Sequence, residues 1–204
     1  MRSKSGQVVW NFTLHKKISR EQLIRKIKSL VPKLRASGFK SKHAIPPVTG
    51  NPELELIQWF YSRKSLLNCF LRSSSSNPFQ SYSISHTKTG SAACLIYSNK
   101  KTTQSVGIDV EQLSRRINPS VIRRVAHPKD NLELNLTPHQ SWTLKEAAFK
   151  ANPRNKKTVL ANYQIVNKIK NKVILKCGKR DFECQLFIRH RHQIAICTPS
   201  KNKV

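Results

Sequence analysis

Ser141-Trp-Thr-Leu-Lys-Glu-Ala-Ala-Phe-Lys150 predicts a helix with two very different faces. Thr137 is a good N-cap residue, Pro138 suits the first helical turn, and Gln140 lies three residues after the cap, where it completes a capping box. With 3.6 residues per turn, one face carries Trp142, Glu146, Phe149 and Lys150, and the opposite face carries Leu144, Ala147, Ala148 and Ala151.

A helix that is apolar on both sides is normally buried, so Glu146 and Lys150 are predicted to be charges inside a cleft. Proteins seldom bury a carboxylate and an ammonium without partners, because removing each ion from water is expensive. On this helix alone, a functional cleft and a simple buried ion pair between residues four apart are equally good interpretations.

A second acidic segment, Gly107-Ile-Asp-Val-Glu111, precedes this helix. Its apolar residues alternate with Asp109 and Glu111, which predicts a strand with both carboxylates on one face. Two like charges on one face repel unless a cation lies between them, and oxygen ligands suit a hard ion such as Mg2+. The alternative is an ordinary strand with a solvated acidic edge, which fits Glu111 better than Asp109. Three of the chain's ten acidic residues fall in these two segments.

Together with Ser83-Ile-Ser-His-Thr87 upstream, these two segments resemble the three sequence motifs of the 4′-phosphopantetheinyl transferases. Their order and spacing are similar to those of the monomeric branch, the surfactin-synthetase and enterobactin-synthetase component D types. The resemblance covers residues 82–152. It implies an α+β fold built from two pseudo-symmetric α+β halves in one chain, which we expect at residues 1–105 and 106–204.

The same resemblance implies the activity. The enzymes of this family use Mg2+ and coenzyme A, and they transfer the phosphopantetheine arm to a serine of an apo acyl or peptidyl carrier protein. Adenosine 3′,5′-bisphosphate is released. Which carrier this chain would serve does not follow from the motifs.

The implied metal ligands are Asp109, Glu111 and Glu146. Glu146 is also expected to relay the serine proton, and Lys150 to offset charge on the transferred phosphate. Lys145 points away from that face and is expected to be peripheral.

The implied coenzyme A contacts lie in the N-terminal half. His86 is expected at a phosphate, with Thr87 beside it. Basic residues of the helix predicted at 52–72, Arg63 and Lys64, are expected to face the nucleotide end. The family's Gly-Lys-Pro stretch before the His86 motif is absent from residues 73–80, so no adenine or ribose contact is assigned.

The chain is strongly basic. It has 38 Lys and Arg against 10 Asp and Glu, a formal net charge of +28 that is spread over both halves. Such a field attracts polyanions, and acidic carrier proteins and coenzyme A both qualify. The alternative function is that of a non-enzymatic basic nucleic-acid-binding protein. That alternative leaves the clustered acids unexplained and lacks an aromatic or glycine-rich RNA-binding signature, so nucleic acid is not the expected partner. Most of the twelve basic residues between Arg2 and Lys42 are expected on a solvated helix face.

Cysteine usage and hydropathy bear on the compartment. The five cysteines are odd in number and lack CxxC spacing, which indicates a reducing compartment and argues against a zinc site or a disulfide framework. No apolar run approaches the roughly 18 residues of a membrane span. The chain is expected to be a cytoplasmic monomer with no membrane partner.

The remaining periodicities predict an alternating helix and strand pattern. Phe187-Ile-Arg-His190 weakly echoes Ser83-Ile-Ser-His86, which suits two related halves but is too short to count as a repeat. Strands are predicted at 7–14, 82–86, 92–97, 158–166, 171–177, 182–189 and 193–198, with further helices beginning after Ser19 and Asn118.

Overall fold

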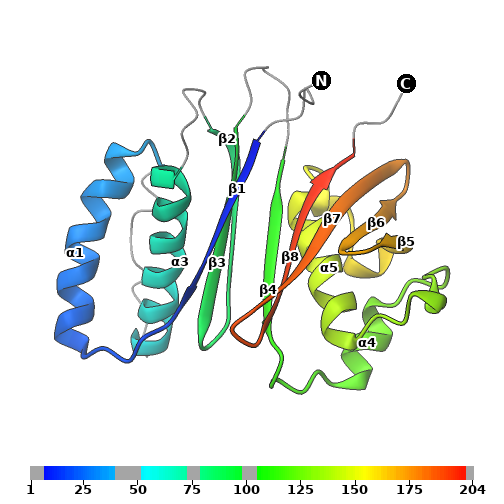
Figure 1. Ribbon diagram of the computed structural model, residues 1–204, viewed down its shortest axis with the longest axis horizontal. Coiled ribbons are helices and arrows are strands. Elements are labelled where there is room, and N and C mark those ends of the chain that lie inside the picture. The colour runs from blue at the N-terminus through cyan, green and yellow to red at the C-terminus, as the bar shows by residue number, and fades with distance from the viewer. Residues whose placement is uncertain (1–6, 40–51, 73–78, 98–104, 201–204) are drawn as a thin grey trace.

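A computed structural model describes residues 7–39, 52–72, 79–97 and 105–200, and this part of the chain is mixed α+β as predicted (Figure 1). In chain order its elements are β1 (Gln7–Leu14), α1 (Arg20–Ala36), α3 (Pro52–Arg72), β2 (Phe79–His86), β3 (Gly90–Tyr97), β4 (Gly107–Gln112), α4 (Pro119–Val125), α5 (Pro138–Ala151), β5 (Gln164–Ile169), β6 (Lys172–Cys177), β7 (Arg180–Arg189) and β8 (His192–Pro199).

The strands form two sheets with related topology. The first has the order β1-β3-β2, and the second has the order β4-β8-β7-β6-β5. In each half a first strand and a helix precede a hairpin, and the last strand of the half sits between the first and the penultimate one. This common order matches the predicted pseudo-symmetry, and β5 and β6 extend the second sheet. The division at residues 105 and 106 follows a stretch outside the described residues and stays a prediction.

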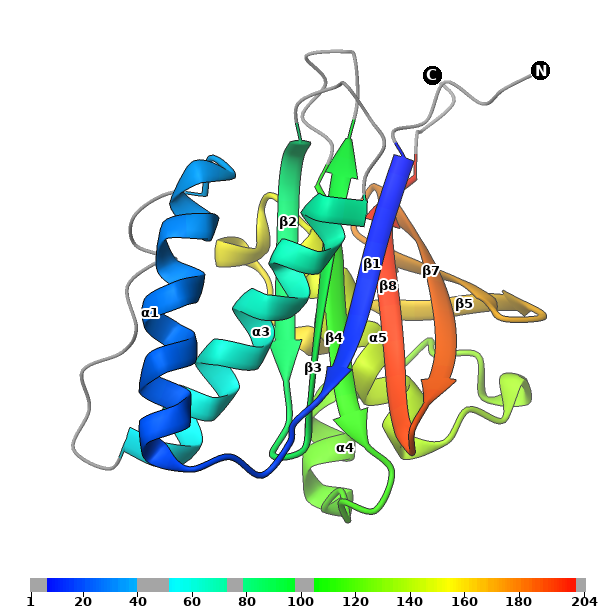
Figure 2. The same ribbon diagram turned by 60° about the vertical axis from the view of Figure 1, so that its left-hand side comes forward.

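The two sheets pack face to face, with helices on their outer sides (Figure 1). Helix α3 covers the first sheet and α1 lies outside α3, while α5 covers the second sheet (Figure 2). Side chains alternate between the faces of β4. Ile108 and Val110 join the core between the sheets, so Asp109 and Glu111 face α5.

The helix starts follow the capping rules read from the sequence. Ser19 and Gln22 form a reciprocal capping box at α1, and Thr137 and Gln140 form another at α5. Asn118 accepts from the backbone amide of Ser120 at the start of α4. These caps satisfy backbone donors that the first turn leaves free.

Gly107 allows α5 to lie directly on β4. A Cβ atom at this position would stand 2.0 Å from the Ala147 carbonyl oxygen and 2.5 Å from the Ala151 amide nitrogen. Both contacts are with helix backbone, which cannot move aside as a side chain can. The small residues of α5 and this glycine together bring the helix close enough to place Glu146 and Lys150 over β4.

One predicted strand was wrong over most of its length. Residues 158–163 form no strand, because a short 3-10 turn over Leu160–Asn162 precedes β5, which begins only at Gln164. Tyr163 is fully buried, and its hydroxyl is 2.7 Å from Asn152 Nδ2 and 3.1 Å from Thr158 Oγ1. The chain turns so that this ring enters the core.

The cysteine pattern argued against a disulfide framework, but the structure contains one disulfide. Cys184 and Cys197 lie opposite each other in β7 and β8, with their Cα atoms 4.1 Å apart, and they are joined by a disulfide. Spacing along the sequence could not show this pair, because the hairpin register alone brings the two residues together. Among the described residues, no helix combines the length and the apolar character that a bilayer crossing requires.

Candidate active site

A pocket of about 410 Å³ lies where β2, β4 and α5 meet. It therefore sits at the junction of the two halves. Its lining combines three carboxylates with a lysine, a histidine and an indole. The lining residues are Ile84, Ser85, His86, Asp109, Val110, Glu111, Trp142, Glu146 and Lys150.

Two serines of β2 attach this strand to β4. The Ile108 amide donates to Ser83 Oγ at 3.1 Å, and the Val110 amide donates to Ser85 Oγ at 3.3 Å. The Ser85 hydroxyl in turn donates to Asp109 Oδ1 at 2.8 Å. The alternating serines of the upstream motif thus position the acidic strand. Neither serine was assigned a role from the sequence, although their spacing by two on a predicted strand was a usable signal.

Asp109 is the most constrained carboxylate of the pocket. It is only 4% exposed, and Lys150 Nζ forms an ion pair with its Oδ1 atom at 2.7 Å. Its other oxygen, Oδ2, is buried and has no hydrogen-bond partner. A buried carboxylate oxygen without a partner is costly, so it marks a position that suits an additional cation.

The charge of Asp109 affects the pKa values of the other two carboxylates of the pocket, Glu111 and Glu146. Burial, followed by the charge of Asp109, raises the pKa of Glu111, while Arg115 and Trp142 oppose the rise. Arg115 Nη1 lies 3.0 Å from Glu111 Oε2. Burial also raises the pKa of Glu146, and Asp109 and Glu111 raise it further against the opposing charge of Lys150. Within the described residues, the Glu146 carboxylate has no hydrogen-bond or ion-pair partner.

These side chains fit a divalent cation in their chemistry. In the described part of the chain, no three His, Cys, Asp or Glu side chains are arranged as a ready metal-binding cluster. The reason is local, because Asp109 turns one oxygen to Lys150 and Glu111 turns both oxygens to Arg115. The partnerless Asp109 Oδ2 and Glu146 carboxylate still line the same pocket. An all-oxygen donor set of this kind suits Mg2+.

His86 and Lys150 supply the nitrogen groups of the pocket. Burial lowers the pKa of His86, and the charges of Arg63 and Lys150 lower it further against Asp109. The neutral imidazole is therefore favoured. Lys150 also approaches Ser85 Oγ at 3.3 Å, so its ammonium bridges β2, β4 and α5.

Three predicted contact residues do not line the pocket. Thr87 belongs to the β2–β3 turn, where its hydroxyl accepts from the Gly90 and Thr89 amides at 3.0 and 3.2 Å. Arg63 lies over the Trp59 ring at 5.6 Å, within electrostatic reach of His86. Lys64 is 6.0 Å from the Tyr61 ring centroid. The pocket thus unites Asp109, Glu111, Glu146, Lys150 and His86, but not these three residues.

Lys145 is not peripheral, contrary to the sequence-based expectation. It is 1% exposed, and its Nζ atom lies 2.7 Å from Asp130 Oδ2 and 2.8 Å from the Val125 carbonyl oxygen. Asp130 also accepts from the His127 and Ile165 amides. Lys145 does point away from the pocket, as predicted, but it ties α5 to the connection after α4. The periodicity identified its direction but not its distant partner.

The chain is similar in sequence to one known protein family over its C-terminal part. Residues 105–197 match the family model of the 4′-phosphopantetheinyl transferase superfamily. The matched segment holds β4 and α5, and with them all three pocket carboxylates and Lys150. The C-terminal half is thus similar to the 4′-phosphopantetheinyl transferase superfamily. Ser85 and His86 complete the pocket from outside the matched segment. No curated protein matches the chain.

Proposed function

We propose that the protein is a 4′-phosphopantetheinyl transferase that modifies a serine of an apo acyl or peptidyl carrier protein. The observation that carries this proposal is the pocket, in which three carboxylates and Lys150 from the matched segment meet Ser85 and His86 from the other half. The phosphopantetheine arm would come from coenzyme A. The pairing of two halves in one chain supports the monomeric surfactin-synthetase and enterobactin-synthetase component D type.

The reaction is a phosphoryl transfer. The carrier's serine oxygen forms a bond to the phosphorus that bears the pantetheine arm. The bond from that phosphorus to the bridging oxygen breaks, and adenosine 3′,5′-bisphosphate leaves with the electron pair. Positioning and neutralisation of charge supply most of the catalysis in such reactions. Asp109, Glu111 and Glu146 would hold Mg2+, whose charge would offset that of the pyrophosphate.

Glu146 is the best candidate to take the serine proton. Its carboxylate lines the pocket without a partner among the described residues, and its raised pKa brings it closer to the working pH of a general base. Lys150 would turn from Asp109 toward the transferred phosphate and offset its charge. The neutral His86 imidazole would donate a hydrogen bond to a phosphate oxygen. Each role needs only side chains that already face the pocket.

The net charge of +28 suits the proposed substrates. Coenzyme A carries several negative charges, and carriers of this kind are typically acidic around the modified serine. A cationic body raises the rate of encounter with both. The exposed Arg123 and Arg124 of α4 are the side chains we expect to contribute for the carrier.

The test is transfer of label from pantetheine-labelled coenzyme A. The protein is incubated with apo acyl and apo peptidyl carrier proteins, with Mg2+ or with a chelator. We expect covalent labelling of at least one carrier that requires Mg2+ and is lost when the carrier's serine is replaced by alanine. Folded protein that labels none of the carriers at any Mg2+ concentration would contradict the proposal.

A further inference from the structure

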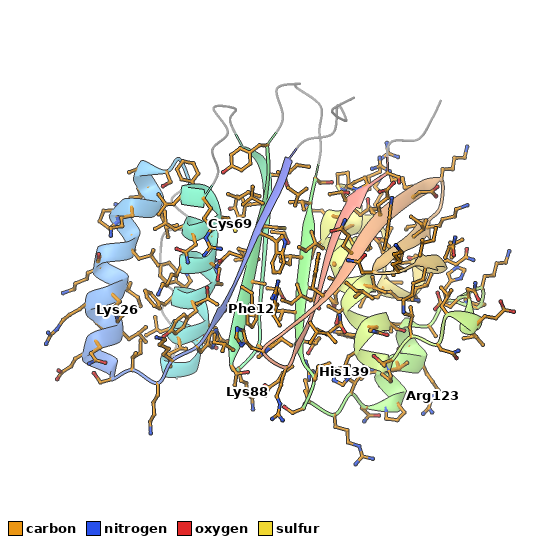
Figure 3. The ribbon with its side chains drawn as sticks, viewed as in Figure 1. Phe12, Lys26, Cys69, Lys88, Arg123 and His139 are labelled. Carbon is orange, nitrogen blue, oxygen red and sulfur yellow. A yellow bond between two sulfur atoms is a disulfide. The ribbon has the colours of Figure 1, made fainter. Side chains whose placement is uncertain are left out.

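Helix α1 presents a strongly basic outer face. Its apolar stripe, which includes Leu23, Ile27, Leu30 and Leu34, is buried in the core cluster that it shares with α3. The opposite side is exposed, and Figure 3 shows Lys26 projecting away from the rest of the protein. We call this surface the outer face of α1; its basic residues are Arg25, Lys26, Lys28, Lys33 and Arg35.

The five cations of this face form two rows. Lys26 and Lys33 lie seven residues apart on one side, Lys28 and Arg35 lie seven apart on the other, and Arg25 is between the rows. At 1.5 Å per residue, each row spans about 10 Å along the helix, and a helix with its side chains is about 10–12 Å wide. The major groove of B-DNA is about 12 Å wide. The rows therefore have a separation that suits the two phosphate backbones bordering such a groove.

No carboxylate of the described residues forms an ion pair with this face. The ion pairs of that part of the chain involve Arg115, Lys145, Lys150 and Lys172, and none of them involves α1. Glu21 is the single acidic residue of the helix. Five like charges held on one rigid helix repel one another, and a polyanion relieves that repulsion.

The outer face of α1 is also remote from the pocket. Helix α3 and the first sheet lie between α1 and the junction where β2, β4 and α5 meet (Figures 1 and 2). The coenzyme A phosphates and the carrier serine would bind at that junction. The charge on α1 is therefore not explained by contacts in the proposed transfer reaction.

The composition of the outer face of α1 favours nucleic acid over a membrane or a protein as its partner. Membrane-binding helices insert an apolar face, but the apolar stripe of α1 is buried and the largest apolar group left outside is Ile24, at 40% exposure. Protein interfaces rely on aromatic and apolar anchors, which this face lacks. Protein–nucleic acid interfaces are more polar and much more positive.

We propose that the outer face of α1 binds the phosphate backbones of duplex nucleic acid, largely without regard to sequence. This binding departs from the expectation that nucleic acid is not a partner, and it is independent of the transfer activity. Contacts to phosphate alone give little base specificity and a steep dependence on salt.

The experiment measures anisotropy of a labelled DNA duplex of about 20 base pairs between about 50 and 200 mM salt. The test variant replaces Arg25, Lys26, Lys28, Lys33 and Arg35 by Gln, which keeps a good helix former at each position. The matched control replaces five exposed lysines of the C-terminal half by Gln. These are Lys129, Lys156, Lys157, Lys170 and Lys176.

For five lost phosphate contacts we expect the slope of log K against log salt to become shallower by about 4.5, and affinity at the lower salt to fall at least about tenfold. The control should change the slope by less than about 1. Both variants should keep normal far-UV circular dichroism and normal carrier labelling.

Equal losses of DNA affinity in the two variants would mean that DNA is attracted diffusely by the net charge, and they would overturn the proposal. Unchanged DNA binding in the α1 variant would overturn it as well. If the α1 variant instead loses binding to anionic vesicles, or loses kcat/KM for an acidic carrier, while DNA binding stays, the face serves a membrane or a protein. A failure of carrier labelling in all three proteins would count against the transferase and leave the DNA result standing.

Discussion

The two halves share a strand order, but the equivalent position of their first strands holds a neutral side chain in one half and a charged side chain in the other. Asn11 of β1 lies opposite Ala93 of the central strand β3, and Asp109 of β4 lies opposite Ala195 of the central strand β8. In the first half, Asn11 Nδ2 donates to Thr13 Oγ1 at 3.0 Å, and the hydroxyl of Ser65 donates to the same oxygen at 2.8 Å. Neutral groups there satisfy one another.

In the second half the equivalent position is charged and incompletely satisfied. Asp109 keeps a buried oxygen without a partner, and the pKa values of Glu111 and Glu146 are raised by burial and by the neighbouring carboxylates. Such an arrangement opposes folding unless something compensates for it. Departures of this kind from local consistency are typical of functional sites.

The junctions between the halves differ in the same way. Where β2 meets β4, serines and carboxylates leave a pocket. Where β1 meets β7, the Trp10 and Phe187 rings pack with their centroids 4.9 Å apart, and the Phe12 ring lies 5.0 Å from His192. One scaffold thus supports a packed aromatic junction on one side and a polar cavity on the other.

The largest effect is expected from a substitution that prevents α5 from packing closely on β4. Gly107→Ala places a methyl group against helix backbone, so α5 must move and Glu146 must leave Asp109. Gly90→Ala is the matched change near the other junction, where the new atom meets the tip of the Phe12 ring, which can shift. We expect Gly107→Ala to unfold the second half or abolish transfer, and Gly90→Ala to destabilise more mildly. Urea unfolding and carrier labelling would measure this, and equal damage from both would contradict it.

The next contrast concerns the two proposed metal ligands of β4. Asp109→Ala should abolish Mg2+-dependent transfer, whereas Glu111→Ala should mainly raise the Mg2+ concentration that is needed, because water can replace an outer ligand. Asn11→Ala, at the equivalent position of the first half, should leave the rate per folded molecule unchanged. Rates titrated against Mg2+ would show the ranking. If Glu111→Ala is the less active enzyme, the roles of the two strand carboxylates are reversed.

Glu146→Gln keeps the shape of the side chain and removes its charge. Loss of a metal ligand or a general base typically lowers turnover by about a hundredfold or more. We expect that loss in kcat with a folded protein, checked by circular dichroism. Near-normal turnover would remove Glu146 from the proposed mechanism.

A smaller effect is expected from charges outside the pocket. Reversing Arg123 and Arg124 to Glu should lower kcat/KM for the carrier by about tenfold at low salt, with little change in kcat, because electrostatic steering acts before the chemical step. The difference from the wild type should fade as the Debye length falls from about 10 Å at 0.1 M salt to about 3 Å at 1 M. A wild-type rate that ignores salt would contradict steering.

Local patterns predicted much of this fold. Capping boxes and helical periodicity located α1 and α5, and alternation located the strand with Asp109 and Glu111. These features depend on residues within a few positions of one another, so a single sequence contains the whole signal. The shared pocket face of Glu146 and Lys150 was predicted for the same reason.

Long-range pairings could not be predicted in this way. Lys145 pairs with Asp130 because the connection after α4 returns to α5, and Cys184 pairs with Cys197 because the register of the β7–β8 hairpin places them opposite each other. The chain turns before β5, where the buried Tyr163 ring packs in the core. Thr87 was placed with His86 because the two are adjacent, but the turn uses the Thr87 hydroxyl for its own amides. Each of these outcomes depends on partners that periodicity does not identify.

The most direct test of the crowded carboxylates is the melting temperature with and without Mg2+. Because the raised pKa of Glu146 favours its protonated form in the folded state, that contribution to stability is present at low pH and is lost as pH rises through the folded-state pKa. At neutral pH in chelator, Glu146→Gln should therefore have a higher melting temperature than the wild type.

Mg2+ should raise the wild-type melting temperature, because a ligand that binds only the folded state stabilises it. It should raise that of Glu146→Gln and Asp109→Ala much less, and that of Asn11→Ala as much as the wild type. These shifts are expected whichever carrier the protein modifies. A wild type whose melting temperature ignores Mg2+, together with a Glu146→Gln variant that melts lower, would contradict it.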